Sequence, residues 1–139
     1  MKVIVLACLL LTPCFEMTMS APEPANVTNV TLVQLIANPE KFDGKLVSVI
    51  GFLRLEFEGN VLYLHREDYD HAILGDGIWV DVTPEMTKHK ESLQMHYVLL
   101  VGIFDSKDRG HMGMWSGSLT KIQRAEAWVA ARTDKPNSR

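Results

Sequence analysis

Hydrophobic and polar residues alternate over several short stretches of this chain, a spacing that predicts β-strands. The longest stretch runs from Lys45 to Phe57. Further strands are predicted over 61–65, 78–82, 97–104 and 118–124, with Gly59-Asn60 as a hairpin turn after the first strand. Alternation divides the side chains of the first strand into a core set (Val47, Val49, Leu53, Leu55 and Phe57) and an outward set (Ser48, Ile50, Phe52, Arg54 and Glu56).

Helices are predicted before the first strand and after the third. Thr31-Leu-Val-Gln34 is a capping-box pattern that predicts a helix over 32–37, and Asn38-Pro39 ends it. Thr83 as a cap and Pro84 at the first helical position predict a second short helix. Two segments complete the domain: 66–76 is predicted to be a polar connection, and 125–131 either extends the fifth strand or forms a terminal helix.

Two of the predicted strands carry near-copies of one sequence, each with a glycine inside an apolar run. They are VSVIGFL over 47–53 and VLLVGIF over 98–104. A glycine inside a strand usually marks a bend or a bulge, and a barrel strand that pairs with two neighbours needs such a bend. We therefore expect Gly51 and Gly102 to lie where the first and fourth strands coil together.

Because the order is three strands, a helix and two strands, residues 32–124 resemble an oligonucleotide/oligosaccharide-binding (OB) domain. The resemblance implies a mainly β fold, a five-stranded OB-like Greek-key barrel with an N-terminal helix and a short helix between the third and fourth strands. The whole chain is similar to small exported bacterial proteins built on that fold. Strand order and glycine placement carry this resemblance, so it implies architecture and no activity.

The first residues have the pattern of a secretory signal. Lys2 precedes an apolar run over 3–11 that is too short to span a bilayer, and small residues lead to a cleavage point after Ser20. Pro13 disfavours lipoprotein anchoring at Cys14. We expect an exported protein, periplasmic or secreted, whose mature chain has no transmembrane span. The predicted layout is a signal peptide (1–20), a flexible lead-in (21–30), an OB-like domain (31–132) and a disordered tail (133–139).

Composition and charge narrow the classes of function. The formal net charge of −3 provides no basic field to attract nucleic acid, which is therefore not the expected partner. Both cysteines, Cys8 and Cys14, lie in the leader, so the mature chain has no thiol for a disulfide. The sequence has no nucleophile elbow, phosphate-binding loop or dinucleotide fingerprint, and we predict no catalytic residue and no cofactor.

The outward side of the first three strands carries aromatic, cationic and polar residues together. On an OB barrel this side often binds single strands or sugars, with aromatic rings as stacking platforms. In the glycine-rich loop over 109–117, Met112, Met114 and Trp115 are expected to close the barrel end. The apolar stripe of the helix over 32–37 could instead cover the aromatic face, and this alternative stays open. The predicted ligand-binding residues are Phe52, Arg54, Tyr63, His65, Trp79, Asp81 and His111.

A second cluster, HREDYDH over 65–71, contains two histidines and three carboxylates. His65 and His71 with one carboxylate could bind zinc, but the spacing matches no established ligand motif and Arg66 argues against a cation site. The favoured function is therefore a non-catalytic exported binding or accessory module for a protein, a peptide or a small glycan. A metal-assisted hydrolase that uses the 65–71 cluster is the alternative, and the sequence does not predict an oligomeric state.

Overall fold

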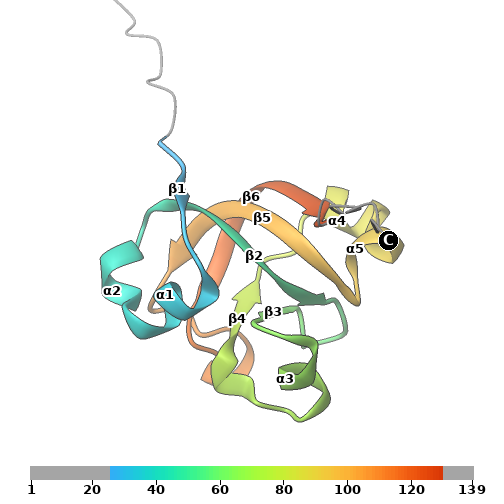
Figure 1. Cartoon of the computed structure of the whole chain (residues 1–139), viewed down its shortest axis with the longest axis horizontal. Helices are drawn as coiled ribbons and strands as arrows, with labels where there is room; N and C mark the ends of the chain where they lie inside the picture. The colour runs from blue at the N-terminus through green and yellow to red at the C-terminus, as the bar shows by residue number, and fades with distance from the viewer. Residues whose placement is uncertain (1–25, 130–139) are drawn as a thin grey trace, which may run out of the picture.

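The computed structural model describes residues 26–129, which form a closed β-barrel with short helices around it (Figure 1). Five of the six strands build the barrel, and the fold is mainly β, as predicted. The strands are β1 (Thr28–Asn29), β2 (Leu46–Arg54), β3 (Val61–Tyr63), β4 (Gly77–Val80), β5 (His96–Asp105) and β6 (Ser118–Ala127).

The barrel closes because β2 pairs along both of its edges. The strand order is β2-β3-β4-β6-β5, and β5 pairs again with β2. β4 and β6 run parallel, whereas the other barrel pairs are antiparallel. This Greek-key order is that of an OB-like barrel. β1 lies within the predicted lead-in and adds a short parallel pairing, with Thr28 opposite Val47.

Gly51 and Gly102 lie within the strands that close the barrel, where the predicted bend requires them. A Cβ on Gly51 would stand 2.7 Å from the carbonyl oxygen of Tyr63, and one on Gly102 would stand 2.8 Å from that of Thr120. The register of β5 on β6 also shifts at Gly102. Gly51 therefore allows β3 to approach the β2–β5 pair closely, and Gly102 allows β6 to do so.

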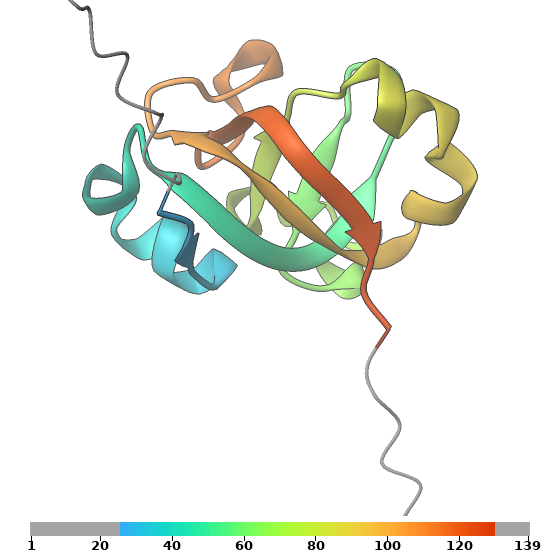
Figure 2. The ribbon, with the colours of Figure 1, turned by 90° about the horizontal axis from the view of Figure 1, so that it is seen from above.

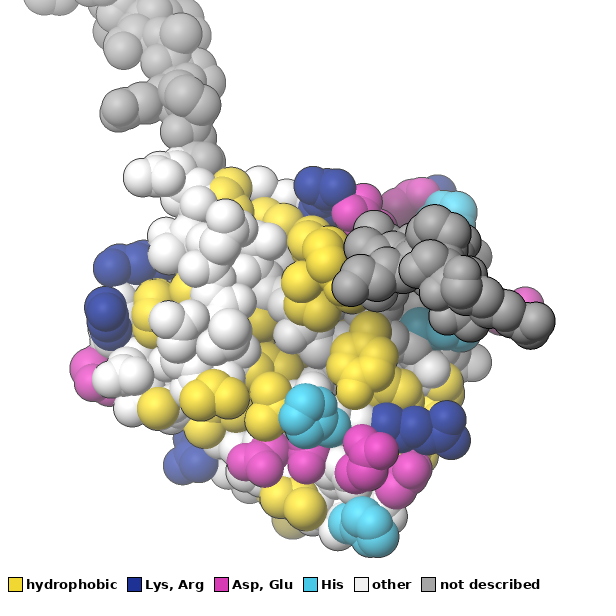
Figure 3. All heavy atoms as spheres, viewed as in Figure 1, with side chains coloured by type: hydrophobic (Ala, Val, Ile, Leu, Met, Phe, Trp, Pro, Cys, Tyr) yellow, Lys and Arg dark blue, Asp and Glu magenta, His cyan; other side chains and the backbone are white. Residues whose placement is uncertain are grey.

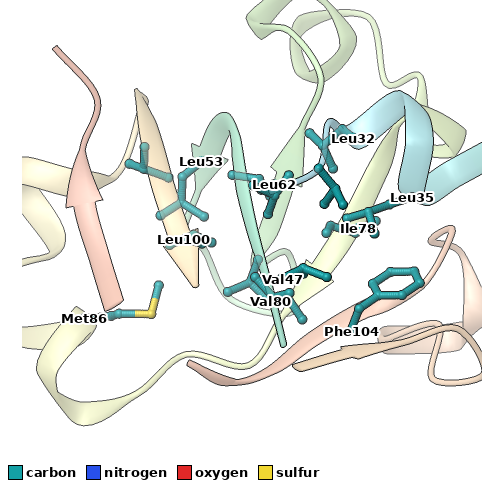
Figure 4. Packing of buried hydrophobic residues seen from close by; sticks show 14 of the residues in the cluster. Leu32, Leu35, Val47, Leu53, Leu62, Ile78, Val80, Met86, Leu100 and Phe104 are labelled. Carbon is teal, nitrogen blue, oxygen red and sulfur yellow. The ribbon is translucent and has the colours of Figure 1, made fainter. Parts of the chain in front are cut away.

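The interior of the barrel is one hydrophobic core (Figure 4). Helix α1 (Leu32–Ala37) places Leu32 and Leu35 at one end of this core, and Met86 lies at the other end (Figure 4); Leu93 belongs to the same core. All four side chains are buried. The helix over 32–37 thus packs into the core and does not lie over the aromatic face.

The helices are short and begin with the predicted caps. The Thr31 hydroxyl accepts a hydrogen bond from the Gln34 N–H at 3.2 Å, and the Thr83 hydroxyl accepts one from the Met86 N–H at 3.2 Å. These bonds satisfy backbone donors that have no partner within the helix. The helices are α1 (Leu32–Ala37), α2 (Pro39–Phe42), α3 (Arg66–Asp70), α4 (Pro84–Lys88) and α5 (Lys90–Leu93), with 3₁₀ turns η1 (Leu74–Asp76) and η2 (His111–Gly113).

Three segments differ in detail from the sequence-based prediction. Pro39 ends α1 as expected, but it also begins α2, because proline fits the first turn of a helix. The single helix predicted after Thr83 is two helices, which meet at His89. The connection over 66–76 was predicted without regular structure, yet it contains α3 and η1.

The ends of two strands also differ from the alternation pattern. β2 ends at Arg54, because the chain turns where the Gly59 N–H donates to the Glu56 carbonyl oxygen at 3.2 Å. Phe57 therefore lies in the turn and is 92% exposed, although alternation assigned it to the core. At the other end of the domain, β6 extends the predicted fifth strand to Ala127.

Alanine at Gly51 or Gly102 should lower the free energy of unfolding by roughly 1–3 kcal/mol, because the added methyl would meet a backbone carbonyl that cannot move aside. Gly75→Ala is the matched control, since a Cβ there meets nothing within 4 Å. Denaturant melts of the three variants measure the difference. Equal stability of all three would contradict the role of these glycines in the bend.

Candidate functional site

The aromatic face predicted to bind a ligand is largely packed inside the protein. Phe52 is 2% exposed and Tyr63 is 5% exposed. Together with Val61 and Trp115 they form a second hydrophobic cluster, outside the barrel core. Burial raises the pKa of Tyr63 to about 12. These two rings therefore lie beneath other side chains and do not form an open platform.

The cover over Phe52 and Tyr63 comes from two connections that follow the face in sequence. Tyr69 of α3 lies with its ring centroid 5.8 Å from that of Tyr63 and 6.4 Å from that of Phe52. Trp115, from the glycine-rich loop, packs edge-on against Tyr63 at 5.8 Å. The Trp115 Nε1 atom is buried and has no hydrogen-bond acceptor within residues 26–129, so the ring acts through packing. The chain thus fills this face with its own aromatic side chains.

Arg54 is held between an aromatic ring and a carboxylate. Its guanidinium carbon lies 5.2 Å from the centroid of Tyr69, and its Nη2 donates to Glu56 Oε2 at 2.8 Å. Burial by itself lowers the pKa of Arg54, but the hydrogen bonds and negative charge of Glu56 outweigh it, so the pKa is raised. Arg54 therefore contributes to the packing of α3 on the sheet.

Trp79 and His111 contact or belong to the glycine-rich loop, and Asp81 follows Trp79 at the end of β4. Trp79 is half-buried, and the backbone of Gly110 packs so closely on its ring that a Cβ would come within 2.6 Å. His111 Nε2 lies 3.6 Å from Glu58 Oε2, which brings the β2–β3 and β5–β6 connections together. Asp81 is exposed, and its N–H donates to the Leu119 carbonyl oxygen at 3.0 Å.

The glycine-rich loop is a fixed cover with an exposed tip. Asp108 accepts hydrogen bonds from the Gly110 N–H at 3.0 Å and from the Ser118 hydroxyl at 2.9 Å, so one carboxylate fastens both ends of the loop. Of the three side chains expected to close the barrel end, only Trp115 is buried, and it packs on the outer face in the second cluster. Met112 is 81% exposed and Met114 40% exposed, because η2 turns them outward and Met112 adopts a φ of 55°.

An apolar groove lies beside this covered face, on the outer surface of β2 and β5. Figure 3 shows hydrophobic side chains gathered there. The groove has a volume of about 540 Å³ and is open to solvent. We call it the Tyr97 groove, and its main lining residues are Ile50, Leu64, His65, Tyr97, Leu99 and Trp128.

The register of the closing strands creates this surface. Ile50 lies opposite Leu99, and Phe52 lies opposite Tyr97, whose ring packs edge-on against it at 5.8 Å. The Trp128 N–H donates to the Tyr97 carbonyl oxygen at 2.7 Å, which places the indole beside the same strand. Ile50, Tyr97 and Trp128 are 39%, 40% and 46% exposed. Three large apolar side chains thus share one accessible surface.

Of the seven predicted residues, His65 lines the Tyr97 groove and Phe52 supports Tyr97 from below. Tyr97, Leu99 and Trp128 were not among the residues predicted from the sequence. Tyr97 and Leu99 alternate with the core residues Val98 and Leu100, so parity on the fourth strand alone would have placed them outside. Only their pairing with β2 brings them next to Ile50.

The histidine and carboxylate cluster over 65–71 does not converge on a common point. Asp68 is buried and accepts a hydrogen bond from the His65 N–H at 2.7 Å, so it caps α3. Arg66 lies 3.4 Å from Asp70 in a surface ion pair. Within the part of the chain that the structure describes, no group of three or more histidine, cysteine or acidic side chains is placed to hold a metal ion.

Comparison of the chain with protein-family models, curated proteins and solved structures found no match. Among residues 26–129, no helix is long and apolar enough to cross a membrane.

Trp115→Ala should lower the free energy of unfolding by about 3–5 kcal/mol, because the ring is buried in the second cluster. Trp128→Ala is the matched control and should cost less than about 1 kcal/mol, since Trp128 is 46% exposed. Denaturant melts followed by circular dichroism measure both. A small loss for Trp115→Ala would mean that the loop does not cover the face.

Proposed function

We propose that this protein is an exported, non-catalytic binding or accessory module on an OB-like barrel, and that the Tyr97 groove binds an apolar stretch of a protein or peptide. The observation that carries the proposal is the shared exposure of Ile50, Tyr97 and Trp128 beside one open groove. Monomeric proteins rarely expose a contiguous apolar surface without using it. Tyrosine and tryptophan are also enriched where proteins bind one another.

The character of the groove favours a peptide over a glycan. A sugar site needs polar groups beside its aromatic rings to satisfy the hydroxyls, because an unpaired polar group costs free energy when it is buried. Most lining residues of the Tyr97 groove are apolar, and the polar ones are Asn29, Thr31, Ser48 and His65. Apolar peptide side chains fit such a lining, with His65 available to bond the peptide backbone.

The seven residues predicted from the sequence would then have different roles. His65 contacts the ligand, and Phe52 supports Tyr97. The burial of Tyr63 and the packing of Arg54 on Tyr69 support a structural role for these two residues. Trp79, Asp81 and His111 would form a separate contact surface near the glycine-rich loop, outside the Tyr97 groove.

A selection from a displayed random-peptide library on the immobilised mature chain should enrich peptides with apolar side chains. Tyr97→Ala and Trp128→Ala should each weaken binding of a selected peptide at least about tenfold, as loss of an aromatic anchor does. Fluorescence anisotropy measures the affinity, and melts verify that the fold is kept.

Phe57→Ala is the matched control, because it removes an exposed aromatic side chain that lies outside the groove. It should leave the affinity unchanged. Peptides that bind all three variants as tightly as the unaltered protein would contradict the assignment of the groove. Enrichment from a glycan array, with none from the peptide library, would contradict the choice of ligand.

Export is supported by Lys2 and the apolar run over 3–11. N-terminal sequencing of the protein recovered outside the cytoplasm of an expressing cell should begin near Ala21. Recovery only from the cytoplasm, with Met1 retained, would contradict this prediction.

A further inference from the structure

Within residues 26–129, the second half of strand β6 pairs with another strand along one of its two edges only. β4 pairs with β6 at Ser118 and Leu119, whereas β5 pairs with it as far as Ala127. Between Arg124 and Ala127, no other strand within residues 26–129 lies beside β6. Figure 2 shows β5 along one edge of β6 and helices α4 and α5 on its other side.

The pairing with β5 determines which way the peptide groups of β6 point. Hydrogen-bonded and non-hydrogen-bonded pairs alternate along an antiparallel ladder. The Trp128 N–H donates to the Tyr97 carbonyl oxygen, so the peptide groups of Glu126 and Arg124 also face β5. The peptide groups of Ala125 and Ala127, which alternate with these residues, must then face away from β5.

Ala125 and Ala127 therefore direct their N–H and C=O groups toward the open edge. Within residues 26–129, these N–H and C=O groups of Ala125 and Ala127 have no backbone hydrogen-bond partner. A row of unpaired peptide groups at a sheet edge is a template for another strand. Their small side chains also leave room beside the edge for the side chains of an added segment.

A small apolar pocket adjoins this edge, between β6 and helices α4 and α5. Its volume of about 100 Å³ has room for one aliphatic side chain. We call it the Met86 pocket, and it shares no residue with the Tyr97 groove. Its main lining residues are Met86, His89, Leu93, Ile122, Gln123 and Ala125.

The charges at the rim of the Met86 pocket are already paired with one another. Glu85 accepts from Lys88 at 3.1 Å and lies 3.0 Å from His89 Nε2. Arg124 Nε donates to Glu126 Oε2 at 3.0 Å. A charged side chain entering the pocket would have to displace these partners, whereas an uncharged one would not. The charge arrangement therefore matches a neutral aliphatic side chain.

We propose that the β6 edge from Arg124 to Ala127 binds an extended segment of a partner protein as an additional strand, with one aliphatic side chain in the Met86 pocket. In this mode backbone hydrogen bonds supply the affinity, and the pocket selects the side chain. The site goes beyond the function proposed for the Tyr97 groove, because it lies on different residues and needs a different ligand conformation.

The first test is amide hydrogen exchange of the mature protein, followed by NMR. In the free protein, the amides of Ala125 and Ala127 should exchange much faster than those of Arg124 and Glu126, which donate to β5. The probe is the acetylated, amidated peptide TVTLTV, which favours an extended chain and carries one leucine. Its addition should shift the Ala125 and Ala127 amide signals and slow their exchange.

Two controls separate strand addition from other binding. The same peptide with an N-methyl group on every residue has no backbone N–H to donate along either of its edges and should shift neither signal. Ala125→Pro should weaken binding about tenfold, as loss of one or two backbone hydrogen bonds would. The barrel should tolerate this proline, because the missing N–H faces the open edge. Phe57→Ala, which changes an exposed residue outside both the β6 edge and the Met86 pocket, should bind as the unaltered protein does.

Ala127→Pro serves in the same way if Ala125→Pro fails to fold. The proposal is overturned if the Ala125 and Ala127 amides are already protected in the free protein, since the edge would then be covered by the chain itself or by a second copy. It is also overturned if neither amide responds to the peptide, or if the N-methylated peptide shifts both amides equally well.

Discussion

The antiparallel pairing of β2 with β5 is the constraint on which the rest of this barrel depends. It runs without interruption from Leu46 opposite Ile103 to Leu53 opposite His96. Each of the two strands must also pair with a third strand, β3 or β6, and a straight strand cannot do both. Gly51 and Gly102 allow this geometry, because a carbonyl oxygen of the third strand occupies the space that a Cβ would need.

Closure of the barrel also determines which apolar side chains on its outer surface stay accessible to solvent. Only part of each long strand is covered from outside, because β3 and β4 are short and the connections after β3 and β5 fold back over part of the surface. Tyr69 and Trp115 cover Phe52 and Tyr63, whereas the surface around Ile50 and Tyr97 stays open. The accessible apolar surface therefore lies next to the face on which OB barrels often bind their ligands.

Alternation and cap residues predicted the succession of strands and the two capped helix starts, and the resemblance to an OB barrel implied how the strands pair. They predicted less where the outcome depended on contacts between distant segments. Phe57 fits the core pattern of its strand, but the hydrogen bond from Gly59 to Glu56 ends the strand before it. Likewise, the outward parity of Phe52 and Tyr63 was correct, but exposure did not follow from it, because residues 69 and 115 supply their cover.

The residues of the candidate site also differ in whether the sequence could predict them. His65 was recognisable from its strand and its chemistry, whereas Tyr97 and Trp128 became candidates only through the register of β5 on β2 and β6. The spacing of residues along the sequence does not predict how these strands are aligned with one another. The open edge of β6 is also a property of pairing, since its sequence, with alternating charges and alanines, resembles that of any solvent-facing strand.

The parallel contact between β4 and β6 has a consequence for how the barrel assembles. It joins Trp79 to Ser118, two residues whose separation along the chain includes α4, α5, all of β5 and the glycine-rich loop. The β2–β5 pairing is of longer range still, since Leu46 lies opposite Ile103. Closing the barrel therefore depends on pairings between segments far apart in the sequence, which slow folding. The apolar strands stay uncovered until these pairings form, and they are where misassembly would begin.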